Sequence, residues 1–522
     1  MAATESRDDH AEPKAEEASE KSPPSVFDHE TPNLPLNART WTIFCALAVL
    51  SFTISLEAAV LVPVLPSIAS ALHGSTSSTL WAGSSYLLTV AVFQPLIGAL
   101  SEEFGHQTLL LGSIALFNIG VLVCSLSHQM TAFLVGRSIQ GLGGGGILAL
   151  INIIPTAMAS LRQRPTAIML NQVGYAAGAI LGPVLGGIIG QYTTWRWIFY
   201  LNFPLCGVTI PILVFGLEGH GSAISLREQF LRLDYIGAVL FLSSACSLLI
   251  GIIWGGEQYP WRSWQTLLPI FCGVVGIIAT LAWEAYLAPR PFLCLSLFRV
   301  RAASAVYLGT CFQGFVLFCQ LYYLPVYFEG VRGYSIASTG LAFLPVTGAM
   351  IVGSLGSGSL IHNTARLRWI IIAGWTLALV STGMLFVFNR TTQTYKWVLI
   401  LLLVGLGHGT LIVSLNYALQ VLAEGRQVAH AMSMYTFLRS FGMCLGVAAG
   451  SSLLQNALRS QSSQSSSATA LMDVMNLATH PELPPALLIS FRYTCAVMTG
   501  VAIAGLVLSF VYAVSSSDVR NR

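Results

Sequence analysis

Apolar stretches as long as a lipid bilayer is thick recur along most of this chain. Each holds roughly 20 residues, the length that a helix needs to cross a hydrocarbon layer of ~30 Å. Fourteen such stretches follow Thr40, at 41–65, 79–100, 108–127, 130–155, 166–190, 195–217, 235–254, 265–287, 304–328, 335–361, 368–389, 397–420, 430–455 and 491–514. The sequence therefore predicts an all-α polytopic membrane protein with fourteen transmembrane helices.

The composition excludes a soluble fold of this length. Of the 522 residues, 54% are hydrophobic and only 9% are charged, a balance that no water-soluble domain could keep. A formal net charge of +3 gives no basic surface for nucleic acid. The ten cysteines are scattered through apolar runs without metal-ligand or disulfide spacing, which favours a packing role. We therefore expect lipid as the main solvent, and no nucleic acid, metal or cofactor.

Polar segments begin, interrupt and end the apolar pattern. Residues 1–40 are acidic and rich in Pro, Glu and Ser, so they are predicted to form a disordered tail. This tail lacks the basic segment and short apolar run of a cleaved signal, which leaves targeting to the first span. Between the last two spans, residues 456–490 include the low-complexity run 460–467 and are predicted to form a flexible outside loop. A short tail, 515–522, ends the sequence.

An even number of spans places both tails on one side of the membrane. With that side inside, the inside segments hold sixteen Lys and Arg residues, whereas the outside loops hold seven. This bias obeys the positive-inside rule, so both tails are predicted to be cytoplasmic. The sequon Asn389-Arg390-Thr391 then lies outside, although its closeness to the membrane argues against glycosylation of Asn389. The plasma membrane is the expected location, with a vacuolar or vesicle membrane as alternatives.

Two opposite charges lie inside predicted spans of the first half of the chain. Glu57 is in the first span and Arg137 in the fourth, where Gln140 shares the face of Arg137. Ionisable residues at bilayer depth usually face a cavity or a partner helix. One interpretation is a purely structural ion pair, or two unrelated groups that reach the interface. The favoured one is proton coupling by a titratable carboxylate, Glu57, which is tuned by the fixed cation of Arg137.

The fifth predicted span carries a glycine at every fourth position. These glycines are Gly174, Gly178, Gly182, Gly186 and Gly190. They trace a groove without side chains, which lets another helix approach at backbone distance. Gly187 is set into this groove, together with Pro183, which removes one backbone hydrogen bond and bends the helix. The pattern predicts one tight interface that moves.

Polar side chains at helical spacing mark the second half of the chain. Gln313 and Gln320 are seven residues apart in the ninth span, and His408 and Asn416 fall on one stripe of the twelfth. Each could simply make an interhelical hydrogen bond, which is the favoured interpretation for His408. Together with Gln140, they are also our candidates for lining a substrate cavity. A lining of amides and aromatic rings suits a bulky, largely apolar compound that forms hydrogen bonds.

Four motifs occur in order between about residues 41 and 514. Residues 178–187 read Gly-Ala-Ile-Leu-Gly-Pro-Val-Leu-Gly-Gly, and residues 136–143 read Gly-Arg-Ser-Ile-Gln-Gly-Leu-Gly. In residues 56–66 an acid precedes Ala-Ala-Val-Leu-Val-Pro-Val-Leu-Pro, and residues 195–204 begin Trp-Arg-Trp and end Asn-Phe-Pro. Together these motifs resemble the major facilitator superfamily, specifically its fungal fourteen-span drug:proton antiporters. The first of them is similar to that family's antiporter motif, through Gly178, Gly182, Pro183, Gly186 and Gly187.

The resemblance implies a major-facilitator fold. Two six-helix halves, 41–217 and 304–514, would each consist of inverted three-helix repeats around a midplane cavity. The segment 218–303 would be a linker that contains two extra central spans.

One motif of that family is only partly present. The loop between the second and third spans reads Gly-Ala-Leu-Ser-Glu-Glu-Phe-Gly-His-Gln over residues 98–107. Gly98, Glu102 and Gly105 match the family pattern, but both of its basic residues are absent. In the family this loop forms charged contacts that latch the cytoplasmic face. Here the latch is expected to be weak, sensitive to protonation of His106, or rebuilt with Arg162 or Arg366.

The energy for transport is expected to come from a gradient. The sequence has no Gly-x4-Gly-Lys-Ser/Thr loop for ATP and no enzyme constellation, so we do not expect an enzyme. We predict a secondary active transporter that couples protons to efflux of small apolar compounds, either drugs or secondary metabolites and toxins. A porter for siderophores or other metal chelates is the alternative within transport, and a non-transporting solute sensor is the alternative outside it. The expected partners are a small-molecule substrate, protons and the lipid bilayer, and the oligomeric state is left open.

Overall fold

The computed structural model describes residues 37–61, 64–74, 76–160, 163–217, 226–255, 258–289, 291–293, 295–364, 366–423, 427–461 and 483–520. Most of the predicted tail 1–40, most of the predicted loop 456–490 and Arg162 lie outside these residues. The described parts of that loop belong to two long helices, α18 (Gln427–Gln461) and α20 (Leu483–Arg520). These helices therefore extend farther than the sequence predicted.

Thirteen helices in the described part are long and apolar enough to cross a membrane. Helices satisfy their own backbone groups, which lipid cannot do. The membrane-crossing elements are α1 (Ala38–Val60), α3 (Thr76–Phe104), α4 (His106–Leu126), α5 (Met130–Met158), α6 (Arg164–Tyr192), α7 (Arg196–Tyr200) with α8 (Asn202–Gly216), α10 (Tyr235–Trp254), α11 (Trp264–Tyr286), α13 (Arg301–Val326) with η2 (Tyr327–Val331), α14 (Ile336–Ala342) with α15 (Leu344–Thr364), α16 (Leu367–Met384) with η3 (Leu385–Val387), α17 (Thr394–Leu422) and α20. Three short helices lie between them, α2 (Leu65–Ala71), α9 (Leu226–Leu231) and α12 (Leu295–Arg299). The all-α polytopic fold is confirmed, and each predicted span lies on one of these elements or on α18.

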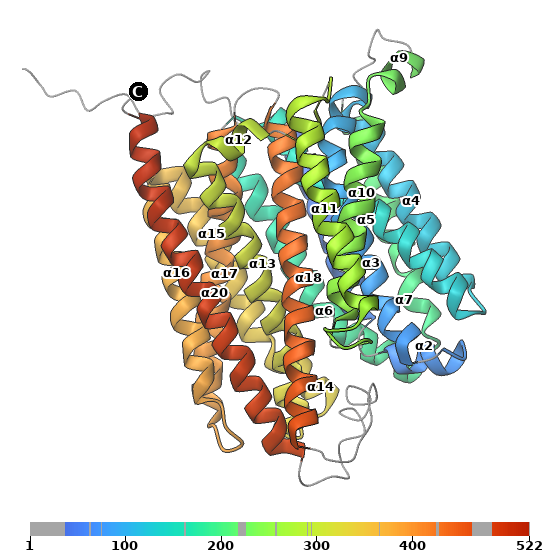
Figure 1. Ribbon diagram of the computed structural model, residues 1–522, viewed down its shortest axis with the longest axis vertical. Helices are drawn as coiled ribbons and strands as arrows, with labels where there is room; N and C mark the ends of the chain where they lie inside the picture. Colours follow the sequence, from blue (N-terminus) through green and yellow to red (C-terminus); the bar gives the residue numbers. More distant parts are fainter. Residues whose placement is uncertain are drawn as a thin grey trace, which may run out of the picture. The chain divides into compact units, whose positions relative to one another are not determined.

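The span predicted at 430–455 is helix α18, which is not among the thirteen apolar ones. This helix packs against α3, α13 and α20, and Figure 1 shows it running beside α13. A helix that has protein on several sides needs less apolar surface than one that faces lipid. Thirteen of the fourteen predicted spans are therefore long and apolar enough to cross a membrane among the described residues, and that α18 also crosses it stays a prediction.

Hydrogen bonds show which helix ends lie at the same end of the bundle. Arg39, at the start of α1, donates from Nε to the carbonyl of Gly216 at the end of α8, at 2.8 Å. Gln107, at the start of α4, donates to the carbonyl of Val214 at 2.8 Å. At the other end of α4, Arg196 donates to the carbonyls of Ser125 and Ser127, at 2.9 and 3.0 Å. Starts and ends thus alternate, as in helices that cross one after another.

The glycine face of α6 lies directly against α1. A Cβ added at Gly182 would lie 2.6 Å from Ala59 Cβ and 3.0 Å from Val60 N, closer than side chains allow. A Cβ at Gly178 would lie 2.8 Å from Leu56 N. The helix that approaches at backbone distance is therefore α1, which belongs to the same predicted half as α6. Whether this interface moves stays a prediction.

The other residues of that motif are placed less closely. Gly186 is buried in α6, whereas a Cβ on Gly187 would meet nothing within 4 Å among the described residues. Pro183 lies within α6, but its side chain is outside the described part. On another side, α6 packs against α15, which is in the second predicted half. The division at 41–217 and 304–514 itself stays a prediction.

A tight turn joins α3 to α4 in the loop at 98–107. Gly105 alone separates the two helices, with a φ of 82°, a conformation that favours glycine. Glu102 lies against His430 at the start of α18, where Nδ1 is 3.2 Å from Oε1 without the alignment of a hydrogen bond. A Cβ on Gly98 would lie 3.0 Å from His430 Cα, so α3 and α18 meet at backbone distance. The sequence analysis did not single out His430 as this partner.

The Glu102–His430 pair is expected to stabilise the contact between α3 and α18. In a double-mutant cycle with Glu102→Gln and His430→Gln, the coupling should be on the order of 0.2–1 kcal/mol, because both groups are partly exposed. Thermal unfolding of the purified protein measures this coupling. The partly exposed His362 serves as the matched control, and should not couple to Glu102. A coupling of zero between Glu102 and His430 would contradict this assignment.

Replacing Gly182 with Leu is expected to destabilise the protein by ~1–3 kcal/mol, the usual cost of overpacking. The new side chain would collide with the backbone of α1, which cannot move alone. Thermal unfolding in detergent measures the loss. Gly187→Leu, on the same helix but facing open space, is the matched control and should unfold close to the parent. A similar loss in both variants would show that contact with α1 is not what fixes α6.

Candidate functional site

Glu57 and Arg137, from the first and fourth predicted spans, meet inside the protein. Arg137 donates from Nη1 to Glu57 Oε1 at 2.6 Å, which joins α5 to α1. It also donates from Nη1 to Gln140 Oε1 at 2.8 Å and from Nε to the carbonyl of Ala82 in α3 at 3.1 Å. The exposed fractions of the Glu57 and Arg137 side chains are 0% and 1%. Neither charge therefore reaches solvent in this conformation.

Two further residues complete this site, and the sequence analysis did not single them out. Asn202, the first residue of α8, donates from Nδ2 to Glu57 Oε2 at 2.6 Å. Tyr86 of α3 places its ring against Arg137, whose Cζ lies 4.4 Å from the ring centroid. The sequence did offer a signal for Asn202, because it is a polar amide within the motif at 195–204 and inside a predicted span. Tyr86 carried no such signal, because an aromatic residue in a span is ordinary.

The geometry around Glu57 is that of an ionised carboxylate. Both oxygens accept hydrogen bonds, one from a guanidinium and one from an amide. A proton on Glu57 would cancel its charge and leave Arg137 with Gln140, Ala82 and the Tyr86 ring. The arrangement can therefore make the contact between α1 and α5 depend on a proton.

A second buried polar cluster joins three helices of the second half. His408 in α17 has Nε2 at 3.0 Å from Gln320 Oε1 and Nδ1 at 3.5 Å from Gln313 Nε2, both in α13. Gln320 in turn donates to Thr382 Oγ1 in α16 at 2.9 Å. These contacts fit a neutral imidazole with its proton on Nε2. The three predicted cavity residues are thus brought together, and in this conformation they bind one another.

Asn416 joins the two predicted halves at a different level of α17. It donates from Nδ2 to Asn152 Oδ1 in α5 at 2.7 Å, and it accepts from Gln420 Nε2 at 2.8 Å. Asn152 was not among the predicted residues. Asn416 and the His408 cluster therefore lie in separate hydrogen-bonded groups, not in one lining.

The predicted sequon lies in a structured turn after η3. Asn389 accepts a hydrogen bond from Arg492 on its Oδ1 at 2.7 Å, and its carbonyl accepts from the Tyr327 hydroxyl at 2.8 Å. The side-chain amide is therefore engaged with α20. This contact adds to the argument against glycosylation, which stays a prediction.

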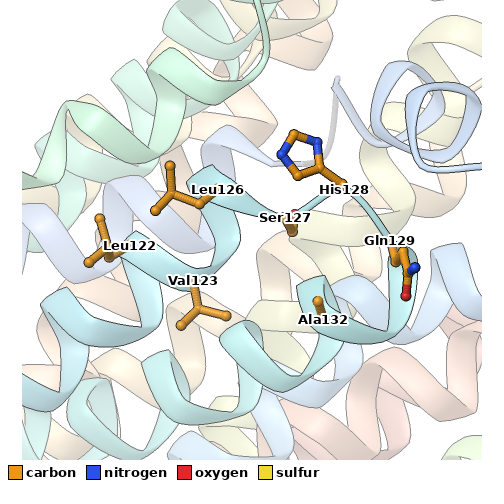
Figure 2. Close-up of a pocket in the computed structure, with 7 residues that line it drawn as sticks. All are labelled: Leu122, Val123, Leu126, Ser127, His128, Gln129 and Ala132. Carbon is orange, nitrogen blue, oxygen red and sulfur yellow. The ribbon is translucent and has the colours of Figure 1, made fainter.

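A hollow of about 470 Å³ opens at the turn between α4 and α5. Figure 2 shows the seven residues that line it, among them His128 and Gln129 in the turn. None of the predicted site residues lines it. The chemistry at Glu57 and His408 instead lies among closely packed helices, where each group is wholly buried.

The described residues offer little to hold a metal ion. Among them, no three His, Cys, Asp or Glu side chains gather closely enough to bind one. The described cysteines are free and spread over eight helices, α1, α4, α8, α10, α11, α13, α18 and α20.

Comparison with known proteins identifies the family. The sequence matches the Major Facilitator Superfamily over residues 47–447. MFS transporter L2 of Phoma sp. is 37% identical, over 80% of this chain and 70% of its own length. MFS efflux transporter aclA of Aspergillus oryzae is 33% identical, over 78% of this chain and 74% of its own length.

A solved structure agrees at the level of the fold. The human organic anion transporter MFSD10 superposes with a TM-score of 0.61, covering 91% of this chain and 100% of that chain, at 15% sequence identity. At this identity the likeness concerns the fold alone. With the family match and the helices described above, this chain is a multi-pass integral membrane protein that belongs to the Major Facilitator Superfamily.

Proposed function

We propose that this protein exports small, mainly apolar compounds and drives that export with a proton gradient. The observation that carries the proposal is the wholly buried contact of Glu57 with Arg137 and Asn202. Several relatives bear names that fit export, among them the efflux transporter aclA and the efflux pump LUC4 of a Fusarium species, which is 32% identical. The plasma membrane is the location that serves export best.

The proposed coupling follows from the cost of charge at bilayer depth. An ion pair there is stable only while both partners stay close, because separating them leaves two uncompensated charges. A proton on Glu57 removes this penalty, so α1 and α5 can part more easily in the protonated form. Alternating access would then exchange a proton at Glu57 between the two sides as the conformational populations shift. A purely structural ion pair would show no such dependence.

The proposed class of substrate follows from the polar side chains that are buried between helices of the second half. The second half offers amides and one imidazole at Gln313, Gln320 and His408, with no acidic side chain in that cluster among the described residues. Such groups suit a bulky compound that forms a few hydrogen bonds, and suit a sugar or phosphate poorly. Drugs and the secondary metabolites of the producing organism are compounds of this kind.

Glu57→Gln is expected to abolish uphill export while leaving downhill exchange measurable. The amide oxygen can still accept from Arg137, whereas the amide nitrogen only donates and loses the hydrogen bond from Asn202 Nδ2. The amide can neither gain nor lose a proton. The measurement is accumulation of a labelled apolar drug in reconstituted vesicles when only a pH gradient is imposed. Arg137→Ala should impair both uphill and downhill movement, because it leaves Glu57 without its cation.

Glu329→Gln is the matched control, since this carboxylate also lies in a span but outside the site. It should accumulate the drug as the parent does. If Glu57→Gln concentrates the drug as well as the parent under the same gradient, Glu57 is not the coupling acid. His408 and Glu284, in α17 and α11, would then be the groups to test.

A further inference from the structure

A second arginine lies inside the spans, and its environment differs from that of Arg137. Arg439 is in α18, twelve residues after the helix begins at Gln427. Its Cζ lies 5.7 Å from the ring centroid of Tyr175 in α6, which is in the other predicted half. Its Nε and Nη2 atoms are buried and have no hydrogen-bond partner among the described residues. No described carboxylate forms an ion pair with it.

The two arginines differ in how many of their guanidinium donors have hydrogen-bond partners. Arg137 has a carboxylate, an amide and a carbonyl on its donors. Arg439 has an aromatic ring beside it and two donors left over. A guanidinium stays charged at any physiological pH and cannot escape the cost of burial by losing a proton. Its remaining donors therefore call for a partner that is absent from this conformation.

Tyr435, one turn before Arg439 on α18, meets only part of this need. Its hydroxyl forms a hydrogen bond with the Arg439 side chain and donates to the carbonyl of Ile412 at 3.3 Å. A hydroxyl that donates to a carbonyl carries no negative charge, so it does not compensate the guanidinium. Nε and Nη2 still have no partner among the described residues.

Further unpaired polar atoms lie on α6, which meets Arg439 through Tyr175, and on α3. Gln172, one turn before Tyr175 on α6, is 5% exposed and has an unpaired Nε2 donor. Gln94 of α3, which packs against α18, has neither amide atom paired among the described residues. The unmet groups of Arg439 and of these two glutamines are thus mostly donors, and donors are matched by an acceptor-rich ligand.

We propose that Arg439 anchors an acidic oxygen of the transported compound, which is an aromatic acid or acidic phenol. A carboxylate, enolate or phenolate would accept from the two free donors of the guanidinium, and the Tyr175 ring would contact its aromatic body. The inference rests on the proposed export function and names the class of its substrate.

The test is binding of 2-naphthoate and 2-naphthamide to the purified full-length protein in lipid nanodiscs, followed by calorimetry. The two probes share one ring system and differ in charge at about pH 7. The parent should bind naphthoate roughly tenfold or more tightly than naphthamide, as a charge-assisted hydrogen bond implies. Arg439→Gln should lower naphthoate affinity to that of naphthamide and leave naphthamide affinity unchanged. Arg439→Lys should keep part of the preference.

The matched control is Arg492→Gln, which removes an exposed guanidinium on α20 and should keep the parent preference. Unchanged naphthamide binding shows that each variant is folded. The proposal is overturned if the parent fails to bind naphthoate or does not prefer it, or if Arg439→Gln keeps the preference. If Arg439→Gln cannot be purified, the acid preference of the parent and its reduction in Arg439→Lys decide in its place.

Gradient-driven transport of the two probes tests the proposed export function separately from the binding of the acid. Gradient-driven movement of uncharged naphthamide by Arg439→Gln, together with lost naphthoate preference, supports both ideas. Parent protein that prefers naphthoate but moves neither probe under a pH gradient would support the anchor and count against proton-coupled export.

Discussion

A charge at bilayer depth persists only where the protein itself satisfies it, and the first group of helices depends on that constraint. Glu57 and Arg137 meet it with one contact of 2.6 Å, to which Asn202 adds another of the same length. The partners come from α1, α5 and α8, with α3 supplying a carbonyl and a ring. Four helices that are distant in sequence are thus fixed around one carboxylate.

That contact needs helices closer together than ordinary side chains permit, and glycine supplies the room. In α5, a Cβ on Gly145 would lie 2.6 Å from the carbonyl of Val90 in α3, and a Cβ on Gly143 would lie 2.6 Å from that of Ser113 in α4. The glycine run after Arg137 therefore seats α5 between its neighbours. In α6, Gly178 and Gly182 do the same against α1. The glycines thus bring together the helices that carry the buried charges.

The sequence predicted the spans well because length and apolarity are local properties, and it predicted the charges of the site because they are rare in lipid. It predicted that Glu57 and Arg137 interact, but not which other side chains join them. Asn202 and His430 were missed because the sequence does not show which amide or imidazole meets a carboxylate on another helix. The glycine spacing predicted a close neighbour for α6 but not that the neighbour would be α1. Helix α18 is also less apolar than the other predicted spans, and it packs against several neighbouring helices that can accommodate its polar residues.

The contacts between the predicted halves are of two kinds. In the first kind backbones meet, since a Cβ on Gly98 of α3 would lie 3.0 Å from His430 Cα in α18, much as α1 and α6 meet within the first half. In the second kind side chains meet, as in the pair of Asn416 with Asn152 and the pair of Glu102 with His430. Side-chain hydrogen bonds and partly exposed charged pairs are each worth little and can be exchanged for water or another partner. A conformational change that separates α18 from α3 would therefore have to break close backbone packing as well as these side-chain contacts, and it would carry Arg439 of α18 with it.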